Sequence, residues 1–302
     1  NNPYGRSARG AGPPQFAFAL ESTVDMLAEK MRIDPLEFRL RKSLRPGETR
    51  SSGRPVEDWP FPALCEALKP RYERARREAS EQRDGPIRRG IGLGAHAFGI
   101  ATPGDSAVVA VELDPDDGVT IYAGVADPGE GDDSMLTQLA ADAMDLPLNK
   151  VRLVLRDTDR TTATGPAAGS RITYLVGGAM LDGLEQLKQA IAETGGTGYD
   201  ALKQSGRPVR YLGRKRNTDE TPGDAESGEG PNFDSEVHGI QLAEVEVNTE
   251  TGQVRVIKVT SAVDAGTVIH PQNLEGQLEG GMDQGAGFAL REEFIPGKTK
   301  DW

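Results

Sequence analysis

The chain has 302 residues with 35 basic and 47 acidic side chains, so its formal charge is −12. An acidic surface cannot displace counterions from nucleic acid, which argues against general nucleic-acid binding. A single cysteine excludes an internal disulfide and a cysteine-ligated iron–sulfur domain. No run of about 18 apolar residues predicts a membrane span, and no secretory leader pattern is visible, so we expect a cytoplasmic protein.

The first part of the chain predicts helices between loops. Residues 1–15 are rich in Gly, Pro and Arg and indicate a loop. An amphipathic helix is predicted over 16–32, because apolar residues recur there at spacings of three and four. Asp34 caps a second helix that starts at Pro35 and runs to about residue 43. A charged third helix is predicted over 62–82.

From residue 88 the pattern changes to alternating strands and helices. A hairpin is indicated by two strand patterns on either side of a Pro/Asp/Gly turn at 114–118. The predicted strands are 90–98, 106–113, 119–125 and 151–155. The predicted helices are 132–144 and 172–192, with a Thr/Gly/Ala/Pro loop over 158–170 between them.

The last part resembles the middle part internally. Residues 238–247 and 253–263 predict a second hairpin, followed by a Gly-rich helix over 274–290. The sequence VELD at 111–114 and VEVN at 245–248 are each followed by a glycine at the same spacing. The fold class predicted is therefore α+β, with two related hairpin–turn–helix layers that form an internal repeat after a helical segment.

The predicted organisation has four parts. A helical segment with an active-site loop is expected at 1–85, and a first α+β cofactor-binding subdomain at 86–212. Residues 213–235 have almost no large apolar side chain and predict a flexible linker. A second α+β subdomain, incomplete at its C-terminus, is expected at 236–302, so we expect a part of a longer subunit.

Three Gly-rich loops stand at predicted helix starts, over 127–133, 164–170 and 274–281. Free N–H groups at a helix start, with glycine beside them, suit a phosphate-bearing ligand rich in hydrogen-bonding groups. For any one loop taken alone, however, a tight turn before a helix is the favoured explanation. The acidic residues of 127–133 do not match the spacing of a calcium loop, which favours a solvated helix cap. The three histidines are widely separated in the sequence, so no histidine metal site is expected.

Motifs in chain order resemble those of the molybdenum hydroxylases, the xanthine dehydrogenase and aldehyde oxidoreductase family, in their molybdopterin-binding subunit. They are RGAGPPQ (9–15), DPLEFR (34–39), GEG (129–131), AAGS (167–170), GGA (177–179), GQLEGG (276–281) and QGAG (284–287). The match covers nearly the whole chain apart from 213–235. The sequence LRPGET at 44–49 is most similar to the bacterial aldehyde oxidoreductases.

The resemblance implies a molybdopterin-binding-domain-like fold and a reaction in which water hydroxylates a carbon of a small-molecule aldehyde or heterocycle. Molybdenum–molybdopterin accepts the electrons, and iron–sulfur clusters, with FAD in some members, lie on other domains or subunits. The expected partners are the remaining parts of the molybdopterin subunit and the iron–sulfur domain or subunit. The alternative is a catalytically silent fragment or an assembly module without bound cofactor. In either case we expect this chain alone to be inactive.

The resemblance also assigns roles to individual residues. Arg9, Gly10 and Ala11 match the substrate pocket, where the guanidinium holds an oxyanion. Ala11 replaces an aromatic residue of many relatives, which implies a wider pocket. Gln277 matches a glutamine that contacts the cofactor. No catalytic residue is expected in this chain, because the glutamate base of the family lies beyond the position of Trp302.

The remaining matches concern the cofactor loops. Gly129, Glu130 and Gly131 match a cofactor-binding loop, but Glu130 stands where the family usually has a glutamine that hydrogen-bonds near the molybdenum ligands. An ionised carboxylate only accepts hydrogen bonds, so Glu130 is either protonated or has a different partner. No residue is expected to bind the metal directly. The loop that binds pterin and phosphate is matched by Gly169, Ser170, Arg171 and Thr173.

Overall fold

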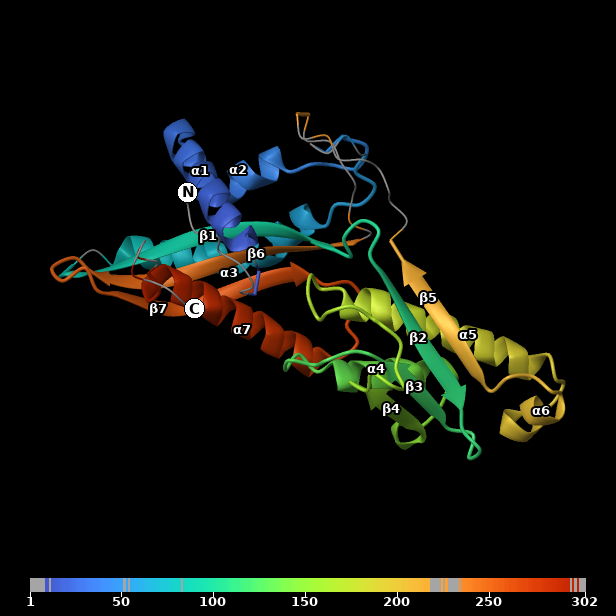
Figure 1. Cartoon of the computed structure of the whole chain (residues 1–302). Coiled ribbons are helices and arrows are strands. Elements are labelled where there is room, and N and C mark those ends of the chain that lie inside the picture. The colour runs from blue at the N-terminus through green and yellow to red at the C-terminus, as the bar shows by residue number, and fades with distance from the viewer. Residues whose placement is uncertain are drawn as a thin grey trace. The chain divides into compact units, whose positions relative to one another are not determined.

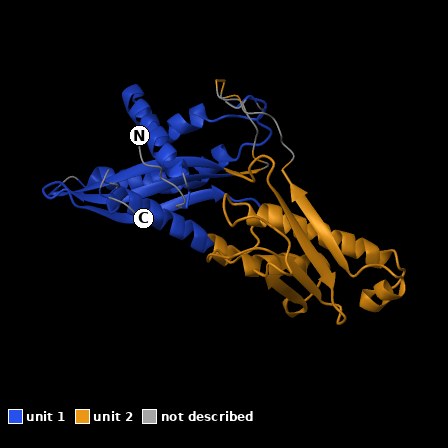
Figure 2. Cartoon of the chain, in the orientation of Figure 1, with its two compact units in different colours: residues 1–98, 237–266, 275–302 blue, residues 99–236, 267–274 orange. Residues whose placement is uncertain are grey.

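The computed structural model describes residues 9–10, 12–50, 53, 55–82, 84–217, 224, 226–227, 233, 235–293, 295 and 298. The chain divides into two compact units (Figure 2). Unit 1 comprises residues 1–98, 237–266 and 275–302, and unit 2 comprises residues 99–236 and 267–274. Both units mix helices with a β-sheet, so the predicted α+β class is confirmed.

Unit 2 is built on a four-stranded sheet in the order β4-β3-β2-β5 (Figure 1). The hairpin of β2 (Ser106–Leu113) and β3 (Val119–Ala123) is confirmed, with Ala110 opposite Tyr122. β4 (Val151–Leu155) adds parallel to β3, and β5 (Arg210–Arg216) adds antiparallel to β2 at the other edge. The sequence RYLGRKR of β5 has few apolar residues, as suits an edge strand.

Helices bury one face of this sheet. They are α4 (Asp132–Met144), the π-helical η2 (Ile172–Val176) and α5 (Gly177–Ala192). The helix α6 (Gly198–Gln204) packs on α5, and the short η1 (Leu148–Lys150) precedes β4 and has no buried residue. The core includes Ile121 from the sheet, Leu136 from α4 and Leu184 from α5, which are all fully buried. α5 and β5 approach most closely at Gly213, where a Cβ atom would lie 1.9 Å from the carbonyl oxygen of Ala179. Only glycine therefore allows this helix–strand contact.

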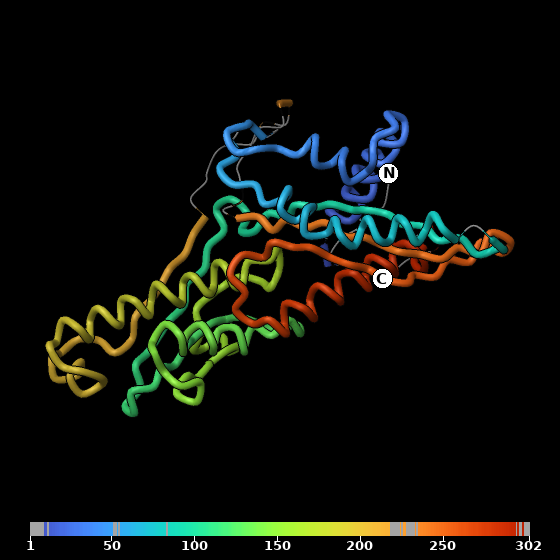
Figure 3. The backbone as a smooth tube through the Cα atoms, turned by 180° about the vertical axis from the view of Figure 1, so that it is seen from behind, coloured from blue at the N-terminus to red at the C-terminus, as the bar shows by residue number. Residues whose placement is uncertain are grey.

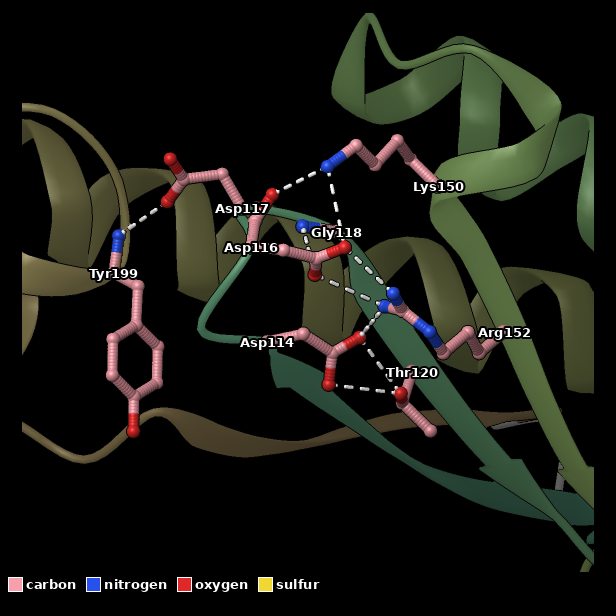
Figure 4. A network of polar contacts seen from close by, with 8 residues as sticks. All are labelled: Asp114, Asp116, Asp117, Gly118, Thr120, Lys150, Arg152 and Tyr199. Carbon is pink, nitrogen blue, oxygen red and sulfur yellow. Dashed lines mark hydrogen bonds and ion pairs between the residues drawn. The ribbon is translucent and has the colours of Figure 1, made fainter.

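A charged network closes the β2–β3 turn (Figure 4). Arg152 of β4 donates to the carboxylates of Asp114 at 2.6 Å and Asp116 at 2.7 Å. Asp117 accepts from the backbone N–H of Tyr199 at the start of α6, at 2.7 Å. The turn thus connects the sheet to a helix that the sequence patterns did not predict.

Unit 1 contains the sheet β1-β6-β7, formed by β1 (Ile87–Ile100), β6 (Ser235–Asn248) and β7 (Val254–Asp264). β1 and β6 each extend by two residues into unit 2. The helix α3 (Phe61–Glu81) lies along this sheet, as the view from behind shows (Figure 3). Cys65 is fully buried between them beside Ile240 and Leu242, where it packs as a small apolar residue.

The helix α1 (Pro13–Met31) packs on α2 (Pro35–Lys42) through polar groups. Arg39 of α2, whose side chain is 3 % exposed, pairs with Glu21 at 2.9 Å and with Asp25 at 2.8 Å. Glu21 also accepts from the N–H of Ala95 in β1 at 2.7 Å. Most large apolar residues of α1 are instead on the surface, whereas Ala28 is buried. The exposed ones are Phe16, Phe18, Leu20, Met26, Leu27 and Met31. Asp34 caps α2 as expected, accepting from two backbone N–H groups.

The expected organisation needs revision in places. Residues 213–216 of the predicted linker form the end of β5, and Ser235 begins β6; most of the residues between them lie outside the described residues. Both hairpins are present, each followed by a helix, the second by α7 (Pro271–Leu290). The sheets around them differ in strand number and order, so an internal repeat stays a prediction. In the described part of the chain, no helix combines the length and apolar character that a membrane crossing requires.

Candidate functional site

The loop before α4 is organised by one carboxylate. Asp127 accepts from the backbone N–H of Gly129 at 2.7 Å and of Gly131 at 3.2 Å. Burial alone would raise the pKa of Asp127, but the backbone N–H groups of the loop hold it below its ordinary value. The loop N–H groups that we expected to attract an anion therefore already bind an internal one.

Glycine is required where this loop turns. Gly129 and Gly131 have φ angles of 130° and 91°, which side chains rarely adopt. A Cβ on Gly131 would lie 2.0 Å from the side-chain nitrogen of Asn273 in the first turn of α7, so the loop and this helix start are in close contact. Gly129 faces open space, which leaves its backbone accessible to a ligand.

The sequence favoured a solvated acidic cap at the start of α4, but one of its four acidic residues, Asp132, is buried. Asp132 is 4 % exposed, and its Oδ2 contacts no hydrogen-bond donor among the described residues. Desolvation, together with a hydrogen bond to Glu130 and its charge, raises the pKa of Asp132 to about 7. Asp133 pairs with Arg156 at 2.7 Å. Asp127, which precedes the helix, accepts from the N–H groups of the loop, and α4 has no side-chain cap at its N-cap residue, Gly131.

The loop over 164–170 is fixed on its buried side by hydrogen bonds from Arg171, which is 4 % exposed. Its guanidinium donates from Nε and Nη2 to the carboxylate of Asp105, at 2.7 and 3.0 Å, and from Nη2 to the carbonyl of Ser106 at 2.7 Å. Nη1 donates to the carbonyl groups of Thr164 and Pro166. The guanidinium nitrogens of Arg171 thus donate to protein oxygen atoms, and these hydrogen bonds stabilise the conformation of the loop.

The outer side of the same loop is open. Gly169 and Ser170 are successive left-handed residues, with φ angles of 61° and 55°, and both are exposed. Thr173 is also exposed at the first turn of η2. Thr164 is 1 % exposed, and its Oγ1 finds no partner within the described residues. The loop therefore presents hydroxyl groups and bare backbone outward and holds one unsatisfied hydroxyl inside.

In unit 1 the structure brings Arg9 and Gln277 together, although 268 positions separate them. Nη2 of Arg9 donates to Oε1 of Gln277 at 2.9 Å and to its carbonyl oxygen at 3.2 Å. Gln284, which follows Gln277 by seven positions in α7, donates from its side-chain amide to the backbone carbonyl of Arg9 at 3.0 Å. Gly10 has a φ angle of 83° and is followed by Ala11, which lies outside the described residues.

Several residues of these clusters were not singled out from the sequence. Asp105, Thr164 and Asn273 have no motif of their own, and only the fold places them beside the loops. Gln284 belongs to the QGAG motif, which was a usable signal. Across the described ranges, no three His, Cys, Asp or Glu side chains are arranged to hold a metal ion.

Comparison with known proteins identifies the family. The molybdopterin cofactor-binding domain matches residues 67–300, and a second family of that description matches residues 1–43. The aldehyde oxidoreductase of Megalodesulfovibrio gigas is 33 % identical over 97 % of this chain and 33 % of its own length. A xanthine dehydrogenase molybdenum-binding subunit of Escherichia coli O157:H7 is 26 % identical over 98 % of this chain and 43 % of its own.

Solved structures agree with the sequence matches. The aldehyde oxidoreductase from Desulfovibrio desulfuricans ATCC 27774 superposes with a TM-score of 0.90 and 32 % identity, over 96 % of this chain and 32 % of that chain. This chain therefore spans about a third of the length of these aldehyde oxidoreductases. The family matches together extend over nearly all of the chain, which belongs to the molybdopterin cofactor-binding domain family of the molybdenum hydroxylases.

Proposed function

We propose that this chain is part of a molybdopterin-dependent oxidoreductase that hydroxylates a carbon of an aldehyde or a heterocycle with water. For an aldehyde, one water oxygen enters the product acid, and two electrons and two protons leave. The electrons are passed to iron–sulfur clusters on other domains or subunits. The 33 % identity to an aldehyde oxidoreductase over 97 % of this chain carries the proposal, and it favours aldehydes over heterocycles.

The residues of unit 2 fit a pterin. A pterin ring carries N–H donors, and the structure offers buried oxygen atoms without a donor in the described part of the chain, Oδ2 of Asp132 and Oγ1 of Thr164. Gly129 and Gly169 leave bare backbone beside them, because nothing lies within 4 Å of the place where a Cβ would stand. The hydroxyl groups of Ser170 and Thr173 are accessible donors for a phosphate.

These observations divide the predicted cofactor residues into two groups. Gly129 and Gly169 allow the ligand to approach the backbone, and Ser170 and Thr173 bind it through hydroxyl groups, whereas Gly131 makes room for Asn273 and so shapes the loop. Arg171 acts indirectly, since its donors hold the loop. When bound, the molybdenum cofactor supplies the two-electron redox chemistry that no side chain provides.

Arg9 is assigned to the substrate. Both of its hydrogen bonds to Gln277 use Nη2, so among the described residues Nε and Nη1 remain available to an oxyanion that develops on the substrate. Gln277 fixes the orientation of the guanidinium and keeps its own amide N–H₂ available to the cofactor. No general base is assigned within this chain, so turnover requires the remaining parts of the molybdopterin subunit.

The test measures cofactor binding and turnover separately. Molybdopterin released from a donor molybdenum hydroxylase is titrated into the 302-residue chain, and binding is followed by quenching of pterin fluorescence. We expect saturable binding that Ser170→Ala weakens, while Ser134→Ala, an exposed serine in α4, leaves it unchanged. We expect no aldehyde-dependent dye reduction by the chain alone. Absence of binding by the wild-type chain would support the silent-fragment alternative.

A further inference from the structure

Lys215 lies on the face of β5 that the helices cover. Side chains alternate between the two faces of a strand, so Tyr211, Gly213 and Lys215 share one face of β5. Tyr211 packs against the core of unit 2, and Gly213 lies against α5. Lys215 is half-buried on the same face. A charged side chain at such a position needs a physical reason.

The side chain of Lys215 runs along the start of α5 toward the loop over 164–170. A Cβ atom on Gly178 would lie 3.2, 3.5 and 3.6 Å from Cγ, Cδ and Cβ of Lys215, so the aliphatic part crosses the first turn of α5. The ammonium lies 5.1 Å from the ring centroid of Tyr174, which is four positions closer to the loop. The positive charge is thus directed toward the end of the helix where Ser170 and Thr173 lie.

The surroundings of this ammonium are electrostatically unfavourable without an anion. Among the described residues, Lys215 contacts the ring of Tyr174 and forms no ion pair with a carboxylate. Asp105, which approaches the same loop, is bound to Arg171. η2 continues directly into α5, and the start of η2 has no side-chain cap. Because the N-terminus of a helix repels cations and attracts anions, a lysine directed toward it indicates a place for an anion.

Protection of an edge strand is the alternative explanation for Lys215. Charged side chains that point inward discourage another strand from pairing with a sheet edge. The edge formed by β5 is already occupied by side chains of α5, however. The N–H of Arg214 donates to the carboxylate of Asp182 at 2.8 Å. Gln186 donates to the carbonyl of Leu212 at 3.4 Å. Lys215 is therefore not needed for this protection.

We infer that Lys215 is a phosphate-binding residue, which holds a phosphate or diphosphate group at the start of η2 together with the exposed hydroxyl groups of Ser170 and Thr173. Lys215 contacts the ligand, whereas Tyr174 and Gly178 are positioning residues. The ring of Tyr174 lies beside the ammonium, and Gly178 leaves room for the aliphatic part of the lysine. That the phosphate belongs to a pterin rests on the proposed function, but the phosphate site itself does not.

The charge is tested with Lys215→Met, which keeps the aliphatic part and removes the ammonium. Molybdopterin released from a donor molybdenum hydroxylase is titrated into the 302-residue chain, with its phosphate group present or removed by a phosphatase. Loss of a charge-assisted contact at a half-buried position should weaken binding of the phosphorylated pterin about tenfold. Binding of the dephosphorylated pterin should not change. Lys188→Met, at an exposed lysine of α5, is the matched control and should bind both pterins as the wild type does.

Two outcomes of this titration would overturn the inference. One is equal affinity of the wild type and Lys215→Met for the phosphorylated pterin. The other is an equal loss of affinity for both pterins, because the lysine would then act on the ring or on the fold and not on the phosphate.

Inorganic diphosphate separates the phosphate site from the proposed function. It is titrated into the ¹⁵N-labelled chain, and the amide signals of Ser170 and Thr173 are followed by NMR. We expect saturable shifts that Lys215→Met weakens about tenfold and Lys188→Met leaves unchanged. Such shifts without any binding of molybdopterin would refute the proposed function and support the phosphate site. No saturable shift in the wild type, or equal affinity in Lys215→Met, would overturn the inference whether or not molybdopterin binds.

Gly178→Ala tests the path of the lysine side chain. The added Cβ atom lies 3.2 Å from a flexible side chain, so the fold accommodates it while the lysine has to move. Diphosphate should bind Gly178→Ala more weakly than the wild type. Addition of Gly178→Ala to Lys215→Met should cause no further loss, because both changes act through the same ammonium. Additive losses would contradict the positioning role of Gly178.

Discussion

Replacement of Arg171 by Met should destabilise unit 2 strongly, although the motif comparison suggested a ligand-binding residue. Met keeps much of the side-chain length and loses the charge. Asp105 loses a partner held at 2.7 and 3.0 Å, and the carbonyl groups of Thr164, Pro166 and Ser106 each lose a donor.

The expected cost follows from the burial of the pair. The side chain of Arg171 is 5 % exposed and that of Asp105 is 25 % exposed. Removal of one partner from a buried pair costs about 3–5 kcal/mol. Asp105 keeps some access to water and the backbone N–H of Ser106 at 2.8 Å, which places this site near the lower end. We therefore expect a loss of about 3 kcal/mol, or a change of about 100-fold in the folding equilibrium of unit 2.

Because the chain has two compact units, the assay must report on unit 2 alone. Native-state hydrogen exchange of the slowest amides in β2 and α5 does so, and about 100-fold faster exchange is expected. Arg207→Met is the matched control, since its pair with Glu193 at 2.7 Å is 41 % and 46 % exposed and should cost less than about 1 kcal/mol. Equal effects of the two variants would refute a structural role for Arg171.

Three other variants probe the packing, the charge network and the substrate site. Gly213→Ala forces a Cβ to within 1.9 Å of a backbone oxygen and should cost about 1–3 kcal/mol or more by denaturant unfolding, whereas Gly92→Ala, at an open strand position, should cost less. A hydrogen bond from Arg152 is the largest cause that lowers the pKa of Asp116 below its ordinary value, so this pair stabilises the fold above that value and loses its contribution as the pH falls. Circular dichroism should therefore show a shallower acid dependence of stability in Arg152→Met, and an unchanged dependence would contradict this. In the assembled enzyme, Arg9→Ala should reduce kcat more than molybdenum content, and equal losses of both would argue against its substrate role.

The elements of unit 2 that the sequence predicted best are those with a local signal. The strands at 106–113 and 151–155 and the helix at 132–144 have the expected bounds, because each combines a clear period with turn or cap residues. β5 and α6 were missed. β5 has few apolar residues, and its place depends on pairing with β2, about 100 positions earlier, which no local pattern records.

The candidate site was predicted at the level of loops and less well at the level of single side chains. Motifs located the Gly-rich loops, and the structure brings Arg9 and Gln277, which had separate assignments to substrate and cofactor, into direct contact. The roles of these side chains stay predictions. The burial of Arg171 depends on Asp105, which is 66 positions away. The burial of Asp132 depends on how α4 packs. Such burial is a property of tertiary contacts, and it decides whether a charged residue faces a ligand or the interior.

Histidines illustrate the same limit in unit 1. His96 and His238 were treated as separate because they are 142 positions apart in the sequence. The structure places them close enough that, after desolvation, the charge of His238 is the next cause that lowers the pKa of His96. The ring of His238 also packs edge-on against Trp59 at 4.7 Å. Residues on paired strands meet regardless of their separation along the chain.

The inward-facing acids of α1 have a consequence for how the chain responds to salt. The pairs of Arg39 with Glu21 and Asp25 fix one orientation of the helix, because charge pairing is directional where apolar contact is not. Phe16, Phe18 and Met26 remain 68 %, 77 % and 69 % exposed on its outer side. Sulfate strengthens association between such apolar surfaces, whereas simple screening by sodium chloride weakens exposed ion pairs. The two salts therefore act on opposite sides of one helix. Sulfate should promote self-association of the chain through the exposed apolar side, whereas sodium chloride should weaken the pair of Arg39 with the more exposed Asp25, which helps to hold α1 in place.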